Sequence, residues 1–304
     1  MNRQVDLAII GAGPGGMTAA LYATRAGLST VMIDASAPGG KLLKTYMVDN
    51  YPGCPETPGP DLAVTMFQQS TSFGAEFLNG TVTSVNMDKQ VFLENGDVID
   101  AKAVLIATGT RERTLNIKGE EEAIGHGESF CAVCDGAFYR GKEVVVIGGG
   151  NSALEEALFL TKFASKVTIV IRRDQFRAEH KVQNLVMENE KIEVIRNHVP
   201  EEVILKDGKV AELVLKSTVD DSTMTIPASG LFPYIGSEPE TGFVRDLDIL
   251  DDKGYVLADD KMGTSVDGIY ACGDCLRKEL RQIVTATADG AIAAQSVFHF
   301  VTGI

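Results

Sequence analysis

The sequence predicts an α/β protein in which one strand–turn–helix–strand unit occurs twice. Residues 5–10 have the apolar pattern of a strand buried in a parallel sheet, and a glycine-rich turn, a helical pattern and a second strand follow. A second copy of this order begins at Val144. With 304 residues and 44% hydrophobic content, the chain has the size and composition of a globular protein of two domains.

The first copy has the pattern of a dinucleotide-binding unit. Its glycines suit a tight turn, close approach of a pyrophosphate and tight packing of helix on strand. The following helix directs its N-terminus at the pyrophosphate, and an acidic residue after the second strand can bind ribose hydroxyls. We predict an FAD site that includes Gly11, Gly13, Pro14, Gly15, Gly16 and Asp34.

The second copy differs from the first at its ribose end. When Gly148 is aligned with Gly11, Ile171 takes the position of Asp34, and arginines follow it. An acid there suits a free 2′-hydroxyl, whereas an arginine cluster suits a 2′-phosphate. We therefore predict an NADPH site, whose candidate residues are Gly148, Gly150, Asn151, Ser152, Arg172, Arg173 and Arg177.

A cysteine pair lies between the two copies. Cys131 and Cys134 are three positions apart, within disulfide reach on a tight turn or on the first turn of a helix. A helix N-terminus lowers the pKa of a thiol, and the adjacent Asp135 can exchange a proton with it. Taken alone, the pattern also fits half of a zinc site or two buried structural cysteines.

The net charge and the start of the sequence indicate which partners and which cellular compartment to expect. A net charge of −14 argues against nucleic acid or an anionic membrane as a partner, and the longest apolar runs are strand-sized. No secretory pattern opens the chain, which predicts a cytoplasmic protein. In that compartment a CxxC pair is more often catalytic or metal-binding than structural.

Together these motifs resemble the low-molecular-weight, bacterial-type thioredoxin reductases, which are flavoproteins with two dinucleotide-binding domains. The resemblance covers essentially the whole chain. It implies FAD and NADPH as cofactors, thioredoxin or a thioredoxin-like protein as partner, and a homodimer. It also implies a Cys131–Cys134 disulfide in which Cys134 faces the flavin, Cys131 attacks the substrate disulfide and Asp135 exchanges the proton. No metal site is predicted.

The resemblance extends the FAD site and sets the domain layout. It implies two Rossmann-like domains, with an FAD domain of residues 1–112 and 243–304 and an inserted NADPH domain of residues 113–242 that carries the CxxC. The expected hinges are residues 113–119 and 239–243. The further FAD residues that it implies are Gly40, Lys41, Leu42, Asn50, Thr108, Gly109, Gly273, Asp274, Arg281, Gln282 and Ile283.

Several alternatives remain open in the sequence. A related dithiol oxidase or a reductase of low-molecular-weight disulfides would use the same centre, and a flavin- or nucleotide-binding redox sensor would use it without turnover. The family has a histidine where this chain has Ile171, which leaves the preference between NADPH and NADH open. Cys272 and Cys275 form a second CxxC, but the turn between them belongs to the flavin motif, and Cys54 is expected to pack in the interior.

Overall fold

The computed structural model describes residues 2–45, 48 and 50–304, with the backbone alone for Asn2, Val133 and Cys134. The chain forms two compact units: unit 1 is Met1–Arg111 with Glu238–Ile304, and unit 2 is Glu112–Ser237. Unit 2 is therefore an insertion in unit 1. The two crossings fall inside the short strands β7 (Thr110–Glu112) and β15 (Ser237–Pro239).

The second crossing lies a few residues before position 242/243, where the sequence analysis placed it. The polar stretch before residue 243 has the composition of a linker. Thr241 within it is nevertheless only 2% exposed, and its hydroxyl donates a 2.6 Å hydrogen bond to the carbonyl of Gly254 in unit 1. The chain is thus part of unit 1 before it reaches residue 242.

Unit 1 is built on a sheet with the strand order β3-β2-β1-β6-β5-β4, in which β16 also pairs with β6. The pairs from β3 to β6 and the pair β16–β6 are parallel, whereas β4 and β5 are antiparallel. The strands are β1 (Asn2–Ile10), β2 (Thr30–Asp34), β3 (Glu76–Asn79), β4 (Val82–Val85), β5 (Gln90–Leu93), β6 (Val98–Ile106) and β16 (Ile269–Ala271).

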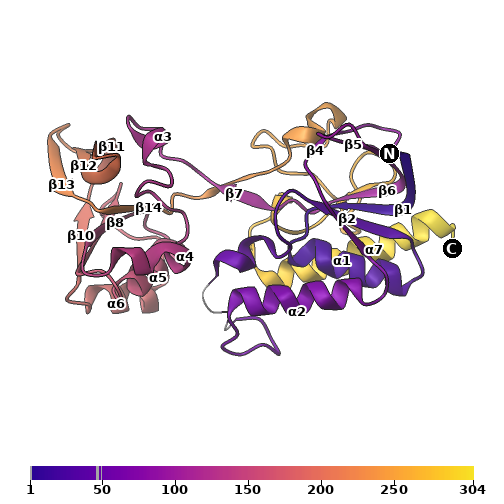
Figure 1. The fold of residues 1–304 in the computed structure, drawn as a ribbon, viewed down its shortest axis with the longest axis horizontal. Helices are drawn as coiled ribbons and strands as arrows, with labels where there is room; N and C mark the ends of the chain where they lie inside the picture. The colour runs from indigo at the N-terminus through magenta and orange to yellow at the C-terminus, as the bar shows by residue number, and fades with distance from the viewer. Residues whose placement is uncertain (1, 46–47, 49) are drawn as a thin grey trace. The chain divides into compact units, whose positions relative to one another are not determined.

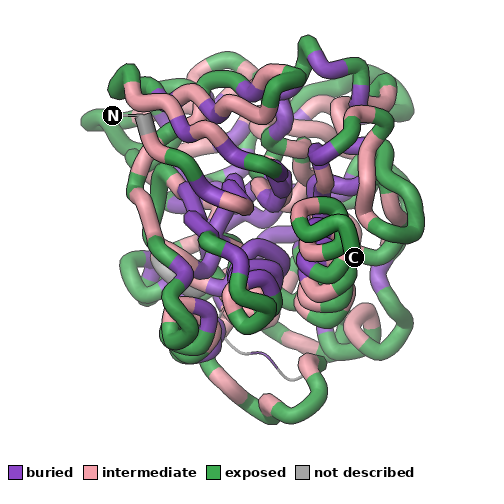
Figure 2. Tube along the Cα trace, turned by 90° about the vertical axis from the view of Figure 1, so that its right-hand side faces the viewer, coloured by how far each residue is buried: buried purple, intermediate pink, exposed green. Residues whose placement is uncertain are grey.

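Three helices cover one face of this sheet: α1 (Pro14–Arg25), α2 (Gly59–Thr71) and α7 (Ile283–Thr302), with α1 between the other two (Figure 1). An apolar cluster with Leu7, Met17 and Ala293 fills the space between sheet and helices. A second cluster covers the opposite face and includes Ile10, Val91 and Val244. Figure 2 shows buried residues along the inner strands and helix faces, with exposed residues outside. Short 3-10 helices complete the unit: η1 (Gly40–Lys44), η3 (Gly242–Leu247) and η4 (Gly273–Cys275).

Unit 2 has a parallel sheet of order β10-β9-β8-β14 and an antiparallel sheet of order β11-β12-β13. Its strands are β8 (Glu143–Ile147), β9 (Lys166–Ile171), β10 (Ile192–Arg196), β11 (His198–Lys206), β12 (Lys209–Ser217), β13 (Thr223–Pro227) and β14 (Gly230–Pro233). Its helices are α3 (Glu120–Ala123), α4 (Ala132–Asp135), η2 (Gly136–Tyr139), α5 (Asn151–Leu160) and α6 (His180–Met187).

The first expected hinge, residues 113–119, is packed into unit 2. Leu115 and Ile117 lie against an apolar cluster that includes Val145 and Leu213, and the carboxylate of Glu120 accepts hydrogen bonds from the backbone N–H groups of residues 115–117. Among the described residues, no helix is both long and apolar enough to cross a bilayer.

The contact between α1 and α7 depends on the absence of a side chain at Gly290. A Cβ atom at this position would lie 2.2 Å from the carbonyl oxygen of Gly15, which is backbone and cannot move aside alone. We expect Gly290→Ala to lower the free energy of unfolding by roughly 1–3 kcal/mol. Urea denaturation followed by circular dichroism measures this change. The control Ala288→Ser, at an exposed position of the same helix, should change the free energy of unfolding by less than about 0.5 kcal/mol. Equal losses of stability in the two variants would contradict the packing argument.

Candidate active site

The glycine-rich turn of unit 1 joins the carboxyl end of β1 to α1. Gly11 has a φ of +107°, and a Cβ there would lie 2.3 Å from the carbonyl oxygen of Ala107. A Cβ at Gly16 would lie 2.0 Å from the carbonyl oxygen of Gly11. Gly13 differs, because a Cβ there would meet nothing within 4 Å. The first and last glycines are therefore required by the fold, and the middle one faces open space.

Asp34 closes this turn from the end of β2. Its Oδ2 accepts a 2.8 Å hydrogen bond from the Ala12 N–H, and its Oδ1 accepts hydrogen bonds of 2.9 Å from the N–H and from the hydroxyl of Ser36. A carboxylate can accept about four hydrogen bonds. Asp34 therefore fixes the loop and keeps acceptor capacity for a ligand hydroxyl.

A cavity of about 640 Å³ opens beside Asp34 within unit 1. The hydroxyl oxygen of Thr108 in its wall is buried and has no hydrogen-bond partner among the described residues. Sequence reasoning missed much of the remaining wall, which is formed by residues 80–83, Arg111 and residues 239–243. Residue 80 follows β3, which pairs with β2 in parallel at Asp34 and Asn79, so only the strand order reveals this proximity.

The second predicted flavin segment packs against the glycine turn. A Cβ at Gly40 would lie 3.3 Å from the Cα of Gly13, and the Gly39 N–H donates a 2.8 Å hydrogen bond to the carbonyl of Ala12. The Lys41 ammonium donates a 2.7 Å hydrogen bond to the Thr110 hydroxyl. The side chain of Leu42 instead lies in an apolar cluster, so this residue can offer a ligand only its backbone.

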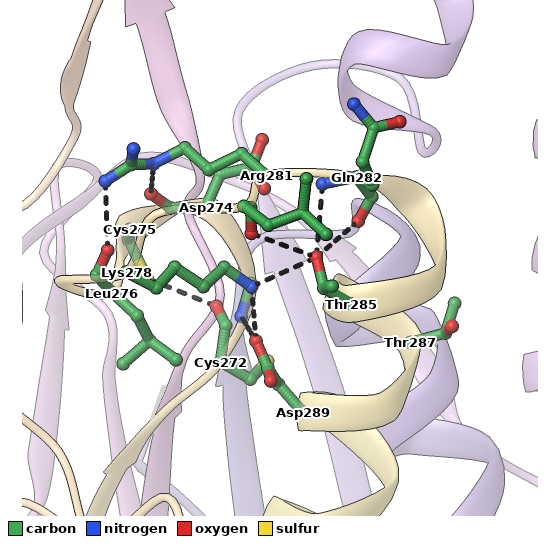
Figure 3. Close-up of polar contacts among 12 residues, drawn as sticks. Cys272, Asp274, Cys275, Leu276, Lys278, Arg281, Gln282, Thr285, Thr287 and Asp289 are labelled. Carbon is green, nitrogen blue, oxygen red and sulfur yellow. Dashed lines mark hydrogen bonds and ion pairs between the residues drawn. The ribbon is translucent and has the colours of Figure 1, made fainter.

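The third segment is the turn after β16, shown in Figure 3. Gly273 has a φ of +81°, and its N–H donates a 3.0 Å hydrogen bond to Oδ2 of Asp289 on α7. The same oxygen forms a 2.6 Å ion pair with Lys278, and both side chains are less than a fifth exposed. Sequence reasoning missed this ion pair because it anchors the turn without being part of the motif.

The charge of Asp274 is opposed by burial. Burial raises the pKa of its carboxyl group, while Lys41, Lys278 and Arg281 lower that pKa and Asp289 raises it further. Arg281 is fixed by hydrogen bonds of 3.1 Å to the carbonyl of Asp274 and 3.2 Å to that of Leu276, and its guanidinium lies 4.3 Å from the centre of the Tyr255 ring. Three cations and a second carboxylate, that of Asp289, thus act on the carboxyl group of Asp274.

Helix α7 begins at this point. Gln282 is its N-cap and forms a capping box with Thr285, and Ile283 is the first helical residue. The Gln282 side chain also accepts a 3.0 Å hydrogen bond from the amide of Asn50. Two residues predicted from distant parts of the sequence are therefore in direct contact.

The second CxxC consists of two buried thiols. Cys272 and Cys275 are free and fully buried, and the Cys275 thiol lies 3.2 Å from the carbonyl oxygen of Cys272. Burial raises the pKa of Cys275 to about 11 and that of Cys272 well above its usual value. Because the thiolate is the reactive form, both groups are poor nucleophiles at neutral pH.

Unit 2 repeats the glycine turn between β8 and α5. Gly148 has a φ of +143°, and a Cβ there would lie 2.3 Å from the carbonyl oxygen of Tyr234. A Cβ at Gly150 would meet nothing within 4 Å. Asn151 begins α5, and its side-chain oxygen accepts a 2.7 Å hydrogen bond from the N–H of Glu179. Ser152 follows it and is exposed.

The arginines of unit 2 lie beyond the carboxyl end of β9. Arg172, Arg173 and Arg177 are exposed, and the Arg177 N–H donates a 2.7 Å hydrogen bond to the carbonyl of Gly149. Ile171 is only 3% exposed and packs in the core, 3.2 Å from the Cβ position of Gly149. The side chain of Ile171 therefore packs against the glycine turn from the core side. The three arginines provide positive charge on the exposed side next to the turn.

The first CxxC lies at the start of α4. Cys131 is disulfide-bonded and buried, and its N–H donates a 3.1 Å hydrogen bond to the Ser129 hydroxyl. The Ala132 N–H donates a 3.1 Å hydrogen bond to the Tyr234 hydroxyl oxygen. Sequence reasoning missed Ser129 and Tyr234. The side chain of Cys134 lies outside the described part of the structure.

Acidic groups surround this helix. Asp135 ends α4 and is half-buried. Burial raises the pKa of Tyr234, and the charges of Glu156, Glu112 and Asp135 raise it further. Burial also raises the pKa of Glu156, on α5, to about 7, with a contribution from Glu155. The Tyr234 hydroxyl therefore stays protonated at neutral pH.

Comparisons with known proteins identify the class of protein. Residues 5–290 match the family model described as pyridine nucleotide-disulphide oxidoreductase. The chain is 47% identical over 298 residues to a thioredoxin reductase of Bacillus subtilis (strain 168), covering 97% of this chain and 94% of that protein. It is 42% identical to the solved thioredoxin reductase of Lactococcus lactis, with a TM-score of 0.94 over 99% of this chain and 100% of that one. The thioredoxin reductase of T. acidophilum is 33% identical, with a TM-score of 0.91 over 97% and 98% of the two chains.

The chain therefore belongs to the pyridine nucleotide-disulphide oxidoreductases and, within them, to the thioredoxin reductases. The predicted fold class, two Rossmann-like domains with the second inserted in the first, is confirmed. The predicted cofactors FAD and NADPH are those of the family. Among the described residues, no group of three or more metal-ligating side chains is placed to hold a metal ion.

The geometry of unit 1 fits a dinucleotide. The open position at Gly13, the unpartnered Thr108 hydroxyl and the cavity beside Asp34 are features that a bound ligand would complete. In unit 2, the open position at Gly150 and the exposed arginines fit a phosphorylated nucleotide in the same way.

The burial of the cysteines predicts their reactivity. In the native oxidised protein, Ellman's reagent should modify Cys54, which is only partly buried, and leave the fully buried Cys272 and Cys275 unmodified. Peptide mapping after quenching identifies the modified residues, and modification after unfolding in guanidinium, where all three should react, is the positive control. Rapid modification of Cys272 in the native protein would contradict the inert assignment.

Proposed function

We propose that this chain is an FAD-dependent enzyme that passes electrons from NADPH through a Cys131–Cys134 disulfide to thioredoxin. The observation that carries the proposal is the full-length family match together with a disulfide-bonded Cys131 at the start of α4, in the unit whose glycine turn is followed by arginines. The proposed domains are an FAD domain made from unit 1 and an NADPH domain made from unit 2.

The FAD site consists of the three segments that meet at the carboxyl edge of the unit 1 sheet. The turn of residues 11–16 binds the pyrophosphate through its N–H groups and the start of α1, and Asp34 binds ribose hydroxyls. The other proposed contacts are Gly40, Lys41, Leu42, Asn50, Thr108, Gly109, Gly273, Asp274, Arg281, Gln282 and Ile283. The chemistry that FAD supplies when bound is two-electron transfer between a nicotinamide and a disulfide.

The NADPH site is the corresponding turn of unit 2. Gly148 and Gly150 allow close approach of the pyrophosphate, and Asn151 and Ser152 lie at the start of α5 beside it. Arg172, Arg173 and Arg177 bind the 2′-phosphate by charge-assisted hydrogen bonds.

The redox centre is held by its neighbours in unit 2. Ser129 and Tyr234 bind the N–H groups of Cys131 and Ala132 and so fix the backbone at the start of α4. The Cys131 thiolate attacks the disulfide of the substrate, which forms a mixed disulfide and releases one substrate thiolate. The Cys134 thiolate then attacks the Cys131 sulfur, which re-forms the Cys131–Cys134 disulfide and releases the second substrate thiolate, and Asp135 exchanges the proton. Reduction of the disulfide consumes two electrons and two protons.

The proposed partners are thioredoxin and a second copy of the chain, and the proposed compartment is the cytoplasm. Phe138, close to the redox centre in sequence, is 73% exposed and offers an apolar contact to a small protein. Tyr22, Ile292 and Phe300 are each more than 40% exposed and line one hollow over α1 and α7, which supports a homodimer through that face.

Cys131→Ser tests the redox roles. NADPH should still bleach the visible absorbance of the flavin in a stopped-flow experiment, because hydride transfer does not use the Cys131 sulfur. Thioredoxin-dependent oxidation of NADPH should fall to the rate without enzyme. The control Cys54→Ser should retain both activities. Retained thioredoxin turnover in Cys131→Ser would refute the assigned roles, and absent bleaching in wild-type protein would refute the reductase proposal.

Arg173→Gln tests the nucleotide preference. Loss of one charge-assisted hydrogen bond to the 2′-phosphate should raise the KM for NADPH by about tenfold to a hundredfold and leave the KM for NADH unchanged. Steady-state kinetics with both nucleotides measure the two values. Lys209→Gln removes an exposed cation elsewhere in unit 2 and should change neither. Equal effects on both nucleotides would contradict 2′-phosphate recognition.

A further inference from the structure

Glu128, on the segment leading to Cys131, is a buried carboxyl group without a hydrogen-bond donor. The residue is 2% exposed, and both of its carboxyl oxygens are buried and unpartnered among the described residues. An ionised carboxylate in such a place has a large desolvation cost, and a neutral carboxyl group still needs an acceptor for its O–H.

Glu120, at the start of α3, provides that acceptor. It is 4% exposed, and its carboxylate accepts hydrogen bonds from the backbone N–H groups of Leu115, Asn116 and Ile117. Three N–H donors stabilise the charged form of a carboxyl group. The backbone brings the two residues together, because the Ile124 N–H donates a 3.0 Å hydrogen bond to the carbonyl of Glu120 and Ile124 forms a β-bridge with Glu128. The charge of Glu120 acts on the Glu128 carboxyl group. Two acceptor-only carboxylates side by side repel, whereas one shared proton joins them by a hydrogen bond.

We propose that Glu128 is protonated and donates its O–H to the Glu120 carboxylate, and that this pair positions the segment that carries Cys131. The pair joins two stretches of backbone. Glu120 holds residues 115–117, and Glu128 lies one residue before Ser129, whose hydroxyl accepts the Cys131 N–H.

Backbone hydrogen bonds at Glu128 and at Ser129 fix this segment within unit 2. The Glu128 N–H donates to the carbonyl of Ala123 at 2.9 Å, and the Ser129 N–H donates to the carbonyl of Leu231 on β14 at 2.9 Å. The stretch from Gly127 to Ser129 is therefore held along the edge of the parallel sheet of unit 2. Glu128 acts on the reaction through Ser129 and Cys131 and is a positioning residue.

The electrostatic surroundings agree with a shared proton. Burial, together with the neighbouring Glu120, raises the pKa of Glu128 to about 8. On the other packed elements, β14 has no ionisable side chain, Lys118 forms an ion pair with Glu202, and the ring of His126 is exposed. Among the described residues, no cation is paired with Glu128.

The sign of the pH effect follows from the two states of Glu128. The unfolded chain loses this proton near pH 4.5 and the folded protein near pH 8. The contribution of Glu128 to stability is therefore complete below about pH 4.5, falls as the pH rises towards 8, and falls no further above that.

Stability of the FAD-loaded protein tests the shared proton. Glu128→Gln keeps a donor towards Glu120 but cannot ionise. Between about pH 5 and pH 8, the unfolding equilibrium constant of the wild type should rise relative to that of E128Q by up to about tenfold per pH unit. E120Q should be destabilised more than E128Q, because one carboxylate oxygen is replaced by an NH2 group that faces at least one backbone N–H donor. The exposed Glu121→Gln, from the same helix, should follow the wild type. A pH-independent difference between wild type and E128Q would overturn the proposal.

Turnover tests the positioning role, and this part rests on the proposed function. Above about pH 8 the ratio of thioredoxin turnover between E128Q and wild type should rise severalfold. Reduction of ferricyanide, which takes electrons from the flavin without the cysteines, should show a constant ratio. A constant thioredoxin ratio would overturn the positioning role. Absence of thioredoxin turnover in the wild type at every pH would refute the proposed function and leave the stability result to decide on the shared proton.

A measurement on the wild type keeps the proposal testable if the variants do not fold. In protein labelled with ¹³C at the glutamate carboxyl groups, one resonance should titrate near pH 8, and E156Q identifies the resonance of Glu156, whose pKa is also raised. If Glu156 accounts for all of the carboxyl titration near neutral and alkaline pH, Glu128 is not protonated and the proposal fails.

Discussion

Each unit depends on one close approach between a turn and the neighbouring strand. At Gly11 and at Gly148, a Cβ atom would lie 2.3 Å from the carbonyl oxygen of the residue that follows the adjacent parallel strand, Ala107 in unit 1 and Tyr234 in unit 2. Only a glycine at positive φ fits there. Because both contacts are between backbone atoms, they fix the start of α1 and of α5 relative to their sheets. This leaves Gly13 and Gly150 facing open space, where a Cβ atom would meet nothing within 4 Å.

The same contact in unit 2 links the glycine turn to the first CxxC. The Tyr234 carbonyl oxygen faces Gly148, and the Tyr234 hydroxyl accepts the N–H of Ala132 at the start of α4. One residue after β14 thus supports both the glycine turn and the start of α4. In unit 1 the equivalent residue is Ala107, which has no hydroxyl group that could support a second helix in this way.

The repeated turn, its glycines and the CxxC could be predicted from the sequence because local geometry demands those residue types at fixed spacings. What could not be predicted depends on which strands become neighbours. Residues 80–83 reach the cavity through the pairing of β3 with β2, Asp289 reaches Gly273 through the packing of α7, and Tyr234 reaches Ala132 across the end of a sheet. Leu42 shows the converse case, because it lies within a correctly located segment but its side chain points into the core.

The groups around the thiols separate Cys131 from the second CxxC, because Cys131, Cys272 and Cys275 are all buried. Cys272 is the N-cap of a 3-10 helix that ends at Cys275, and Cys131 lies just before α4. Cys272 and Cys275 are free thiols, and their burial favours the neutral form. The atoms around Cys131 are polar: the Ser129 and Tyr234 hydroxyls bind its end of the helix, and Asp135 ends that helix. A thiol that gains and loses a proton, as proposed for Cys131, needs polar groups nearby. Thiols that only pack in the interior, as Cys272 and Cys275 do, need none. Glu128 belongs with the polar groups around Cys131, because its proposed proton fixes the backbone that leads through Ser129 to Cys131 and adds no buried charge there.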